Sequence, residues 1–454
     1  MRKPHVVVIG GGFGGLAVAQ GLAKAPVTVT LLDRRNHHLF QPLLYQVATA
    51  ALNPSDIAYP IRAALASQHN ARVLLAEAKR IDVDNKKVIL DSGEIGYDYV
   101  VVATGATHSY FGNPWQQVAP GLKSIEDALE IRRRVFLAYE AAERESDPAA
   151  QRDWLTFVVV GGGPTGVELA GTLGEIGLQT LAHDFRSIDS TQVRVVLFEG
   201  RDRVLGAYPP KISDAAKRSL EKRNVEVQID ARVTAIDDRG VTVQTANGVE
   251  RVGARTVLWA AGVQASPLAT SLPVARDRSG RVEVMPDLTI PDHPEVFVIG
   301  DLARMKITET EEVPGVAQGA LQGGRHVAKL IAAEARADER RQARPARKPF
   351  RYHDKGNMAT IGRMSAVVAT KRFALSGVFA WLMWWVVHIF YIVGFRNRFF
   401  VMLSWAWSWL TFKRGARLIT GDVPALPAIE TIGPDGQQVL PPAARPVELP
   451  RAPN

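Results

Sequence analysis

The chain has 454 residues, of which 46% are hydrophobic and 22% are charged, a balance typical of a folded protein with about three domains. Its net charge of +9 would suit nucleic acid, but no zinc, recognition-helix or stacking-sheet motif accompanies it, so an anionic membrane surface is the better partner. The absence of cysteine excludes redox disulfides and thiolate-ligated iron–sulfur clusters, and we assign no metal site.

A glycine fingerprint opens the chain at Val6–Gly15, where a valine-rich run breaks into G-x-G-x-x-G at the expected start of a helix. Gly10 makes the tight turn, Gly12 lets backbone N–H groups approach a pyrophosphate, and Gly15 permits close helix–strand packing. Asp33 closes the next strand, where a carboxylate can bind an adenosine ribose. A purely structural glycine turn is the alternative.

The same fingerprint returns at Val158–Glu168, so two nucleotides are expected. Its three glycines are Gly161, Gly163 and Gly166. Glu199 is the matching acid, but an extra polar stretch at 183–192 precedes it, which makes this assignment less secure than that of Asp33.

A second stretch is also duplicated, since Ile81–Ala106 resembles Ile236–Val263: a short strand, a turn, a β-hairpin and a hydrophobic strand ending at a glycine. Ligands of doubly wound domains lie at the carboxyl ends of strands, so Gly105 and Gly262 should border the nucleotides. Asp301 follows a further strand of the buried type, where it either contacts a flavin ribityl or caps the next helix.

These positions together resemble the flavoproteins that contain two dinucleotide-binding domains. The resemblance implies FAD on the first unit and on the Asp301 segment, and a nicotinamide cofactor on the second unit. The missing cysteines exclude the disulfide reductases, cysteine-dependent peroxidases and sulfide:quinone reductases of that superfamily. Electrons must therefore pass from nicotinamide to flavin to an external acceptor.

Three further stretches, Phe40–Ala48, Pro314–Gly324 and Gly356–Arg363, resemble signatures of the type II NADH:quinone oxidoreductases, and the likeness extends from Val6 to about Leu418. It implies that Ala317–Gln322 matches an A-Q-x-A-x-Q element beside flavin and quinone, with glycine here in third place.

The two glutamines of that element, Gln318 and Gln322, are four apart on one expected helix face, and their amides could hydrogen-bond quinone carbonyls. Capping or solvating roles for both glutamines are the alternative. The helix is expected to begin near Pro314–Val316 and to direct its N-terminus at the flavin.

Glu168 is expected in the first turn of the second nucleotide helix, where the helix dipole alone could explain an acid. The family resemblance implies a place near nicotinamide and flavin and a part in catalysis or proton handling. Burial would raise the pKa of this carboxyl. Lys371 is a weaker candidate for the quinone pocket, because a Lys-Arg pair before an apolar helix is more often an interface anchor.

Six of the nine tryptophans lie within Phe373–Phe412. They are Trp381, Trp384, Trp385, Trp405, Trp407 and Trp409, flanked by the basic residues Lys371, Arg372, Arg396, Arg398, Lys413 and Arg414. Tryptophan with arginine favours the bilayer interface. Phe373–Phe395 is long enough to span a bilayer core, whereas Phe399–Phe412 is too short to return, so composition leaves spanning and surface binding open. The family resemblance favours a monotopic anchor, and a buried helix pair of a soluble domain is the other alternative.

We therefore predict an α/β fold with two Rossmann-type dinucleotide-binding domains, glutathione-reductase-like, plus C-terminal membrane-anchoring helices. The expected bounds are 1–121 with 263–335 for the FAD domain, 122–262 for the NADH domain, 336–420 for the quinone and membrane-anchor region, and 421–454 for a disordered tail. The residues expected to bind cofactors are Gly10, Gly12, Gly14, Gly15, Asp33, Gln41, Leu43, Ala103, Thr104, Gly105, Gly161, Gly163, Thr165, Gly166, Glu199, Gly262, Gly300, Asp301, Ala317 and Gln318.

The predicted activity is hydride transfer from NADH to non-covalent FAD, then transfer of two electrons to a membrane quinone without proton pumping. Glu168, Gln318, Gln322 and Lys371 are the candidate catalytic residues. The expected partners are a lipid surface, the quinone pool and a second copy in a homodimer, with no nucleic acid. The first strand starts within a few residues of Met1, which leaves no room for a signal peptide and predicts the cytoplasmic side of the inner membrane. A soluble ferredoxin- or rubredoxin-type NAD(P)H reductase and a non-catalytic nucleotide-sensing membrane protein are the alternatives.

Overall fold

The computed structural model describes residues 2–181, 184–308, 311–411 and 416–422, with three short pieces at 426–427, 431–432 and 438–439. The last two pieces are the paired strands β26 (Thr431–Ile432) and β27 (Gln438–Val439). The predicted disordered tail, 421–454, therefore lies mostly outside the described residues.

The first nucleotide unit is built on a six-stranded sheet in the order β20-β21-β9-β1-β2-β5, with every neighbouring pair parallel except β20 and β21. Val6, Val7 and Val8 in its centre are fully buried, as expected for a parallel sheet that is covered on both faces. The strands are β1 (His5–Ile9), β2 (Thr28–Asp33), β5 (Ala71–Leu75), β9 (Tyr99–Val102), β20 (Thr289–Ile290) and β21 (His293–Val298).

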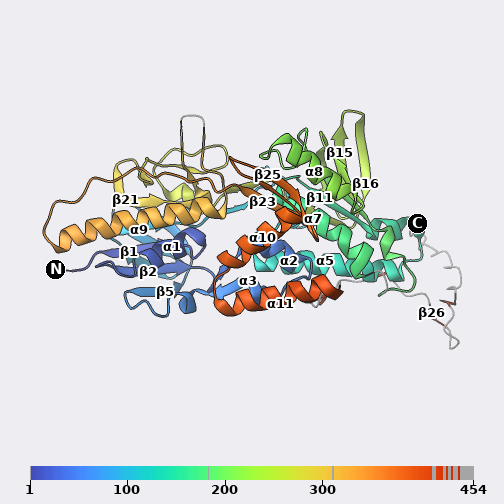
Figure 1. Ribbon diagram of the computed structural model, residues 1–454, viewed down its shortest axis with the longest axis horizontal. Helices are drawn as coiled ribbons and strands as arrows, with labels where there is room; N and C mark the ends of the chain where they lie inside the picture. The colour runs from blue at the N-terminus through green and yellow to red at the C-terminus, as the bar shows by residue number, and fades with distance from the viewer. Residues whose placement is uncertain are drawn as a thin grey trace, which may run out of the picture.

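Two long-separated helices cover this sheet side by side, α1 (Phe13–Gly21) and α9 (Ala317–Glu339) (Figure 1). They lie close because both carry glycine where they meet: a Cβ on Gly324 would overlap the carbonyl oxygen of Gly14. The remaining short elements are β3 (His37–Leu39), α2 (Leu44–Ala48), α3 (Pro54–Ile57), β4 (Ala58–Pro60) and α4 (Ile61–Ala64).

The second unit repeats the first, because its parallel sheet has the order β13-β12-β11-β17 and matches β5-β2-β1-β9 position by position. The strands are β11 (Thr156–Val160), β12 (Arg194–Phe198), β13 (Val225–Gln228) and β17 (Thr256–Trp259). The helices are α5 (Ile125–Arg144), α6 (Pro148–Trp154), α7 (Pro164–Glu175) and α8 (Pro210–Glu221). The expectation of one architecture used twice is confirmed.

Each unit also carries the predicted antiparallel hairpin as part of a three-stranded sheet. These strands are β6 (Ala78–Asp82), β7 (Lys87–Leu90) and β8 (Gly93–Gly96) in the first unit, and β14 (Arg232–Asp237), β15 (Gly240–Thr245) and β16 (Gly248–Gly253) in the second. The chain crosses between the units along an antiparallel pair, β10 (Ala106–His108) with β18 (Val263–Ala265). Strands β19 (Val282–Glu283) and β22 (Ala303–Arg304) form a further short parallel pair.

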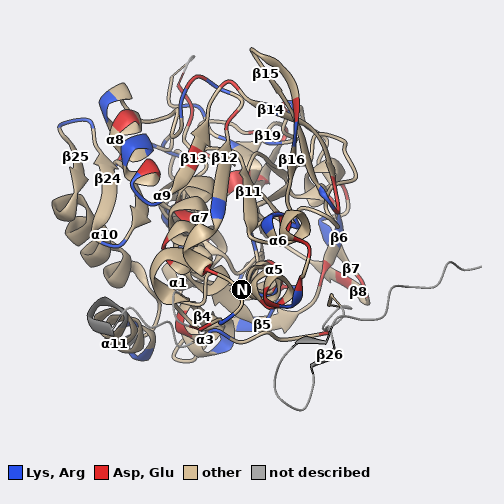
Figure 2. Cartoon of the chain, turned by 90° about the vertical axis from the view of Figure 1, so that its right-hand side faces the viewer, with Lys and Arg blue, Asp and Glu red and all other residues tan. Residues whose placement is uncertain are grey.

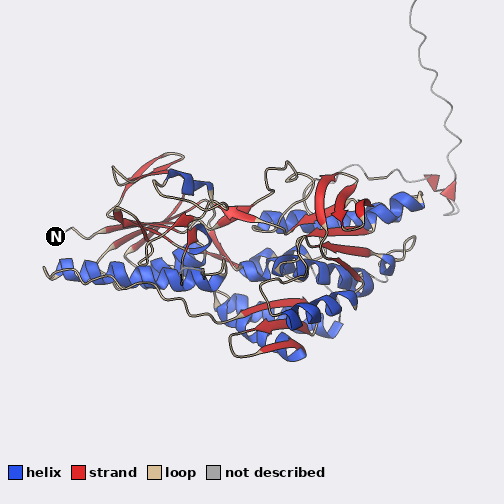
Figure 3. Ribbon diagram, turned by 90° about the horizontal axis from the view of Figure 1, so that it is seen from above, coloured by secondary structure: helices blue, strands red, loops and turns tan. Residues whose placement is uncertain are grey.

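The C-terminal region contains a three-stranded antiparallel sheet that the sequence did not predict, formed by β23 (Asn357–Gly362), β24 (Ser365–Ala369) and β25 (Ala374–Gly377) (Figure 3). Strand β25 uses the start of the apolar stretch expected to be one helix, and Gly377 then turns the chain with a φ of 84°. Helix α10 (Val378–Tyr391) has 14 residues and helix α11 (Phe395–Thr411) has 17. In the part of the chain that the structure describes, no helix is long and apolar enough to cross a membrane.

Helices α10 and α11 pack beside α2 and α3 rather than extending away from the body (Figure 1). Trp384 is only 2% exposed, and the Asn397 side chain donates hydrogen bonds to the carbonyls of Ser55 and Ala58 at 3.2 and 3.1 Å. Their other faces are open and apolar. The exposed residues are Val378, Phe379, Leu382, Val386 and Phe390 on α10, and Phe399, Phe400, Met402, Leu403 and Trp407 on α11.

The charged residues also avoid α10. This helix carries no Lys, Arg, Asp or Glu and is tan throughout in Figure 2, whereas α8 carries charges of both signs. Arg396 on α11 lies over the ring of Phe400, with its guanidinium carbon 5.0 Å from the ring centre. Lys413, Arg414 and the side chain of Trp409 lie outside the described residues.

Candidate functional site

The first fingerprint has the backbone that its glycines predict. Gly10 has a φ of +102°, and a Cβ there would lie 2.5 Å from the Ala103 carbonyl oxygen. A Cβ on Gly15 would overlap the carbonyl oxygen of Gly10. Gly12 differs, since a Cβ there would meet no described protein atom within 4 Å. This open side, at the start of α1, is where backbone N–H groups can receive an anionic ligand.

The second fingerprint reproduces this geometry. Gly161 has a φ of +107°, and a Cβ there would lie 2.6 Å from the backbone of Ala260. A Cβ on Gly166 would overlap the carbonyl oxygen of Gly161, while a Cβ on Gly163 would face open space as on Gly12. Thr165 lies at the start of α7.

The two acids are held in the same way. One Asp33 oxygen accepts a hydrogen bond from the Gly11 N–H at 2.6 Å, and the other accepts one from the Arg35 N–H at 2.7 Å. Glu199 accepts from the N–H groups of Gly162 and Arg201 at 2.6 and 2.9 Å. The polar stretch that made Glu199 uncertain therefore leaves its position equivalent to that of Asp33.

The ends of three strands meet beside the first fingerprint. Thr104 follows β9, and its buried Oγ1 has no hydrogen-bond partner among the described residues. Gly105 and Gly300 both adopt positive φ, of 66° and 73°. Asp301 lies next to Gly315, where a Cβ would be 3.7 Å from its Oδ1, just before α9 begins at Ala317. A buried polar atom without a partner is uncommon, so Thr104 Oγ1 indicates a ligand at this edge.

A pocket of about 130 Å³ lies where the two units face each other. The lining combines residues of the first unit, the crossing strands and the second unit, and consists of Gln41, Leu44, Tyr45, His108, Leu122, Lys123, Thr165, Glu168, Trp259, Ala260, Gly262 and Val263. Predicted cofactor residues Gln41, Thr165 and Gly262 are thus brought together, whereas Leu43 is fully buried in the core.

Glu168 is the acidic residue of this pocket, and burial raises the pKa of its carboxyl to about 8, although the nearby backbone N–H of Thr360 opposes this rise. It is therefore mostly protonated at neutral pH. The expectation that it lies in the first turn is wrong: α7 begins at Pro164 and its first turn contains no acid. The helix dipole consequently does not account for Glu168.

Thr360 was not predicted, because it comes from β23, almost 200 residues later in the chain. The strand reaches α7 because α7 has glycine at the crossing: a Cβ on Gly171 would overlap the carbonyl oxygen of Ile361. The Thr360 hydroxyl also bonds the Tyr45 hydroxyl at 2.7 Å, so the C-terminal sheet joins both units at the pocket.

The hydrogen bonds continue from there to the C-terminal helices. The Gln46 amide donates to the Tyr45 hydroxyl at 2.9 Å, and the Trp405 indole donates to the Gln46 oxygen at 2.6 Å. Trp405 was predicted only as an interface residue. The only signal for this role was Gln46, one of two glutamines within the otherwise apolar Phe40–Ala48 stretch.

The two candidate glutamines have different surroundings. The Gln318 side chain lies near the hydroxyl of Tyr391 at the end of α10 and lowers the pKa of that phenol. The Gln322 amide is engaged at both ends by the backbone of His353, donating to its carbonyl at 3.0 Å and accepting from its N–H at 2.9 Å. Gln322 therefore holds the segment before β23 against helix α9.

Lys371 is exposed in the turn between β24 and β25 and does not line the pocket that contains Glu168. The sequence placed it before an apolar helix, but a strand follows it.

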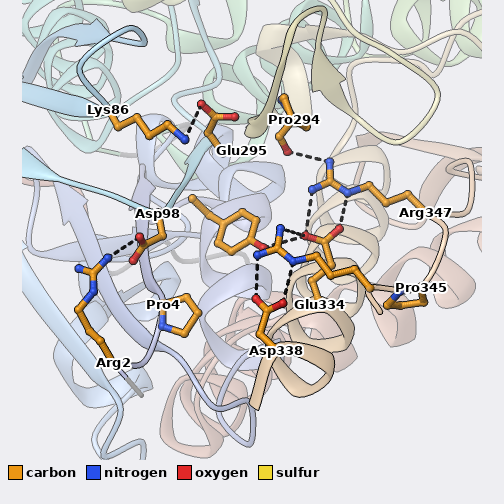
Figure 4. Close-up of a pocket in the computed structure, with 12 residues that line it drawn as sticks. Arg2, Pro4, Lys86, Asp98, Pro294, Glu295, Glu334, Asp338, Pro345 and Arg347 are labelled. Atoms are coloured by element: carbon orange, nitrogen blue, oxygen red, sulfur yellow. Dashed lines mark hydrogen bonds and ion pairs between the residues drawn. The ribbon is translucent and has the colours of Figure 1, made fainter. Parts of the chain in front are cut away.

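A larger cleft, of about 640 Å³, lies away from the fingerprints (Figure 4). Its charged groups neutralise one another in pairs: Arg2 with Asp98 at 2.6 Å, Lys86 with Glu295 at 3.4 Å, Arg344 with Asp338 at 2.7 Å and Arg347 with Glu334 at 2.5 Å. Its size exceeds that of the pocket at Glu168, but its chemistry is that of a structural ion-pair network. Asp338, near the end of α9, and Arg344, just after it, belong to this network.

The protein has two candidate dinucleotide sites that face each other. Each has the same glycine fingerprint and a carboxylate held in the same way, and one pocket lies between them. Comparisons with known proteins agree. The family described as "Pyridine nucleotide-disulphide oxidoreductase" matches residues 4–324. "Type II NADH:quinone oxidoreductase Ndh" of Mycobacterium tuberculosis is 46% identical over 92% of this chain and 91% of its own length, and the NdhA protein of that organism is also 46% identical, over 93% and 90%.

Among solved structures, NDH2 from Plasmodium falciparum in complex with NADH superposes with a TM-score of 0.82 over 92% of this chain and all of that one, at 19% identity. This match supports the fold. The chain belongs to the pyridine nucleotide-disulphide oxidoreductase family and, within it, to the type II NADH:quinone oxidoreductases.

Proposed function

We propose that the protein oxidises NADH and reduces a membrane quinone by way of a non-covalent FAD, without pumping protons. The observation that carries this proposal is the pocket in which Glu168 and Gly262 of the second unit face Gln41 and Tyr45 of the first. Family membership supports the same reaction. The soluble reductase and the non-catalytic sensor become outcomes of the test below.

The residues of the first unit fit FAD. Backbone N–H groups at Gly12 would hold the pyrophosphate, and Asp33 the ribose. The Thr104 hydroxyl, which has no hydrogen-bond partner among the described residues, and Asp301 lie between this fingerprint and α9, whose first-turn N–H groups carry partial positive charge. When bound, FAD supplies the two-electron redox chemistry.

The residues of the second unit fit NADH. Gly163 leaves room for its pyrophosphate, and the Glu199 carboxylate, fixed by Gly162 and Arg201, would accept hydrogen bonds from the ribose hydroxyls. Thr165 and Gly262 border the pocket where the nicotinamide would lie. A side chain at Gly262 would collide with the Phe111 ring and Ser109, so glycine keeps this wall thin.

Glu168 and Gln318 supply the protein's own contribution. Glu168 is neutral at pH 7 and can release or accept a proton close to neutral pH, which suits proton handling at the shared pocket. The Gln318 amide, in the first turn of α9, can hydrogen-bond a quinone carbonyl. Lys371 keeps only the role of an interface anchor in this proposal.

We further propose that α10 and α11 dock on one leaflet of the cytoplasmic membrane from its inner side, and that the working form is a homodimer. The exposed apolar residues of the two helices and the arginines beside them support an interfacial position. A quinone could then approach without leaving the bilayer.

The test is rapid mixing of the purified, yellow protein first with NADH and then with a soluble quinone analogue. We expect NADH to bleach the flavin and the quinone to restore its colour. Reduction by NADH followed by reoxidation only with a protein acceptor would favour the soluble reductase. NADH binding without bleaching would favour the sensor.

A further inference from the structure

The hydroxyl of Tyr391, the last residue of α10, lies between two polar groups from distant parts of the chain. The Lys355 ammonium is 3.1 Å from the hydroxyl oxygen and 5.8 Å from the ring centre. The Gln318 side chain, from the start of α9, lies near the same hydroxyl and also lowers the pKa of the phenol. One phenol thus lies beside a cation and the residue proposed to contact the quinone.

The position of this phenol is unusual for a polar group. Phe379, Leu382, Val386 and Phe390 form the open apolar face of α10, and Tyr391 follows directly at its end. The Phe390 ring is 67% exposed, while the Tyr391 ring packs edge-on against it at 5.4 Å and is partly buried. The Tyr391 hydroxyl thus lies at the end of the helix that carries this apolar face, near the Gln318 side chain.

The charges around Tyr391 favour release of its proton. Lys355 lowers the pKa of the phenol through its hydrogen bond and its charge, with smaller contributions from Gln318 and from the charge of Arg325 on α9. Partial burial opposes this lowering but does not reverse it. A tyrosinate formed here would be stabilised by the ammonium 3.1 Å away.

We propose that Tyr391 is a catalytic residue that donates a hydrogen bond, and then a proton, to one carbonyl oxygen of the quinone, and that Lys355 is the positioning residue that stabilises the resulting tyrosinate. This inference rests on the proposed function. The quinone gains two electrons and one proton from NADH by way of FAD, and its second proton from Tyr391. The tyrosine O–H breaks, the quinol O–H forms, and the exposed Lys355 returns a proton from water to the tyrosinate.

The test compares Tyr391→Phe and Lys355→Met with two matched controls. Tyr352→Phe removes a phenol hydroxyl three residues before Lys355, and Lys329→Met removes an exposed lysine farther along α9. Flavin reduction by NADH should change less than about twofold in all four variants. Reoxidation by a soluble quinone should slow roughly 100-fold in Tyr391→Phe, the effect typical of a lost general acid, and should stay normal in both controls.

A binding measurement separates catalysis from structure. The dissociation constant of the quinone analogue for the oxidised enzyme, followed by tryptophan fluorescence, should rise about threefold to tenfold in Tyr391→Phe, as expected for one lost hydrogen bond. Because Tyr391 must hold its proton to donate it, wild-type reoxidation should fall at alkaline pH. Lys355→Met should move that fall to higher pH, and Tyr391→Phe should abolish it.

Normal reoxidation and normal quinone binding in Tyr391→Phe would overturn the proposal, as would equal slowing in Tyr391→Phe and Tyr352→Phe. Slowed flavin reduction by NADH would also overturn it, because it would place Tyr391 on the nicotinamide side. These results differ from failure of the proposed function, in which the wild-type flavin is not reoxidised by quinone at all and both proposals fall.

Discussion

Replacing Glu168 by glutamine should change how stability depends on pH. Glutamine keeps the shape and an acceptor oxygen for the Thr360 N–H, but is neutral at every pH. The wild-type carboxyl has a pKa of about 8 when folded and the usual value of 4.5 when unfolded. Between those values the folded state holds a proton that the unfolded state has released, so raising the pH destabilises the wild type and leaves this site in the variant unaffected.

The size of the effect follows from one pKa unit being worth about 1.4 kcal/mol. From pH 5.5 to 7.5 the free energy of unfolding of the wild type should fall relative to Glu168→Gln by at most about 2.7 kcal/mol. Below about pH 4.5 both states of the wild type hold the proton, and the difference between the proteins should become constant.

Urea titration followed by tryptophan fluorescence, at both pH values and for both proteins, measures this double difference, in which all other titrating groups cancel. The same variant should lose any pH dependence near 8 from quinone-driven reoxidation of the flavin. Parallel stability curves for wild type and variant, within about 0.5 kcal/mol, would refute the argument that burial keeps Glu168 protonated.

Three other changes test the remaining parts. Glu199→Gln should reduce the preference for NADH over NADPH about tenfold in kcat/KM, by removing repulsion of a 2′-phosphate; a wild type with equal or inverted preference would show that Arg201 and Arg203 control the pocket. Gln318→Leu should leave flavin reduction by NADH intact and slow quinone reoxidation about tenfold; the reverse pattern would move Gln318 to the nicotinamide side. Phe379→Glu with Val386→Glu should release the protein from anionic vesicles without lowering its melting temperature; retention on vesicles washed with carbonate would contradict surface docking.

As a test of anchoring, the last pair of substitutions is preferable to deleting everything after Lys371. Trp384 and Val401 are buried in the main hydrophobic core, and Trp405 bonds Gln46. Deletion would therefore uncover core surface as well as remove the anchor, and loss of activity would have two explanations.

The sequence predicted the backbone of the two glycine fingerprints because their geometry is local. Gly10 and Gly161 are needed for a backbone with positive φ, and Gly15 and Gly166 for contacts within five residues, so both requirements leave a mark at fixed spacing. Glu168 was identified from family resemblance, but its position in the first turn of α7 was predicted wrongly. An error of one residue in the predicted helix start is enough to change that position.

The sequence failed where a residue acts through a distant partner. Thr360 reaches Tyr45 across 315 residues, and Gln322 pairs with a backbone 31 residues away. Strand β25 was hidden at the start of a stretch expected to be an apolar helix, because short apolar runs favour either structure until they find neighbours. Lys355 and Tyr391 carried no signal of their own.

The sequence by itself therefore determined the conformation of the two fingerprints, the positions of Asp33 and Glu199, and the absence of thiol chemistry. Each of these depends only on nearby atoms or on residue type. Only the tertiary structure determined the raised pKa of Glu168, the different surroundings of Gln318 and Gln322, and the contact between Lys355 and Tyr391. These depend on how much water is excluded and which remote groups approach, and both quantities exist only after the two units and the C-terminal sheet have packed together.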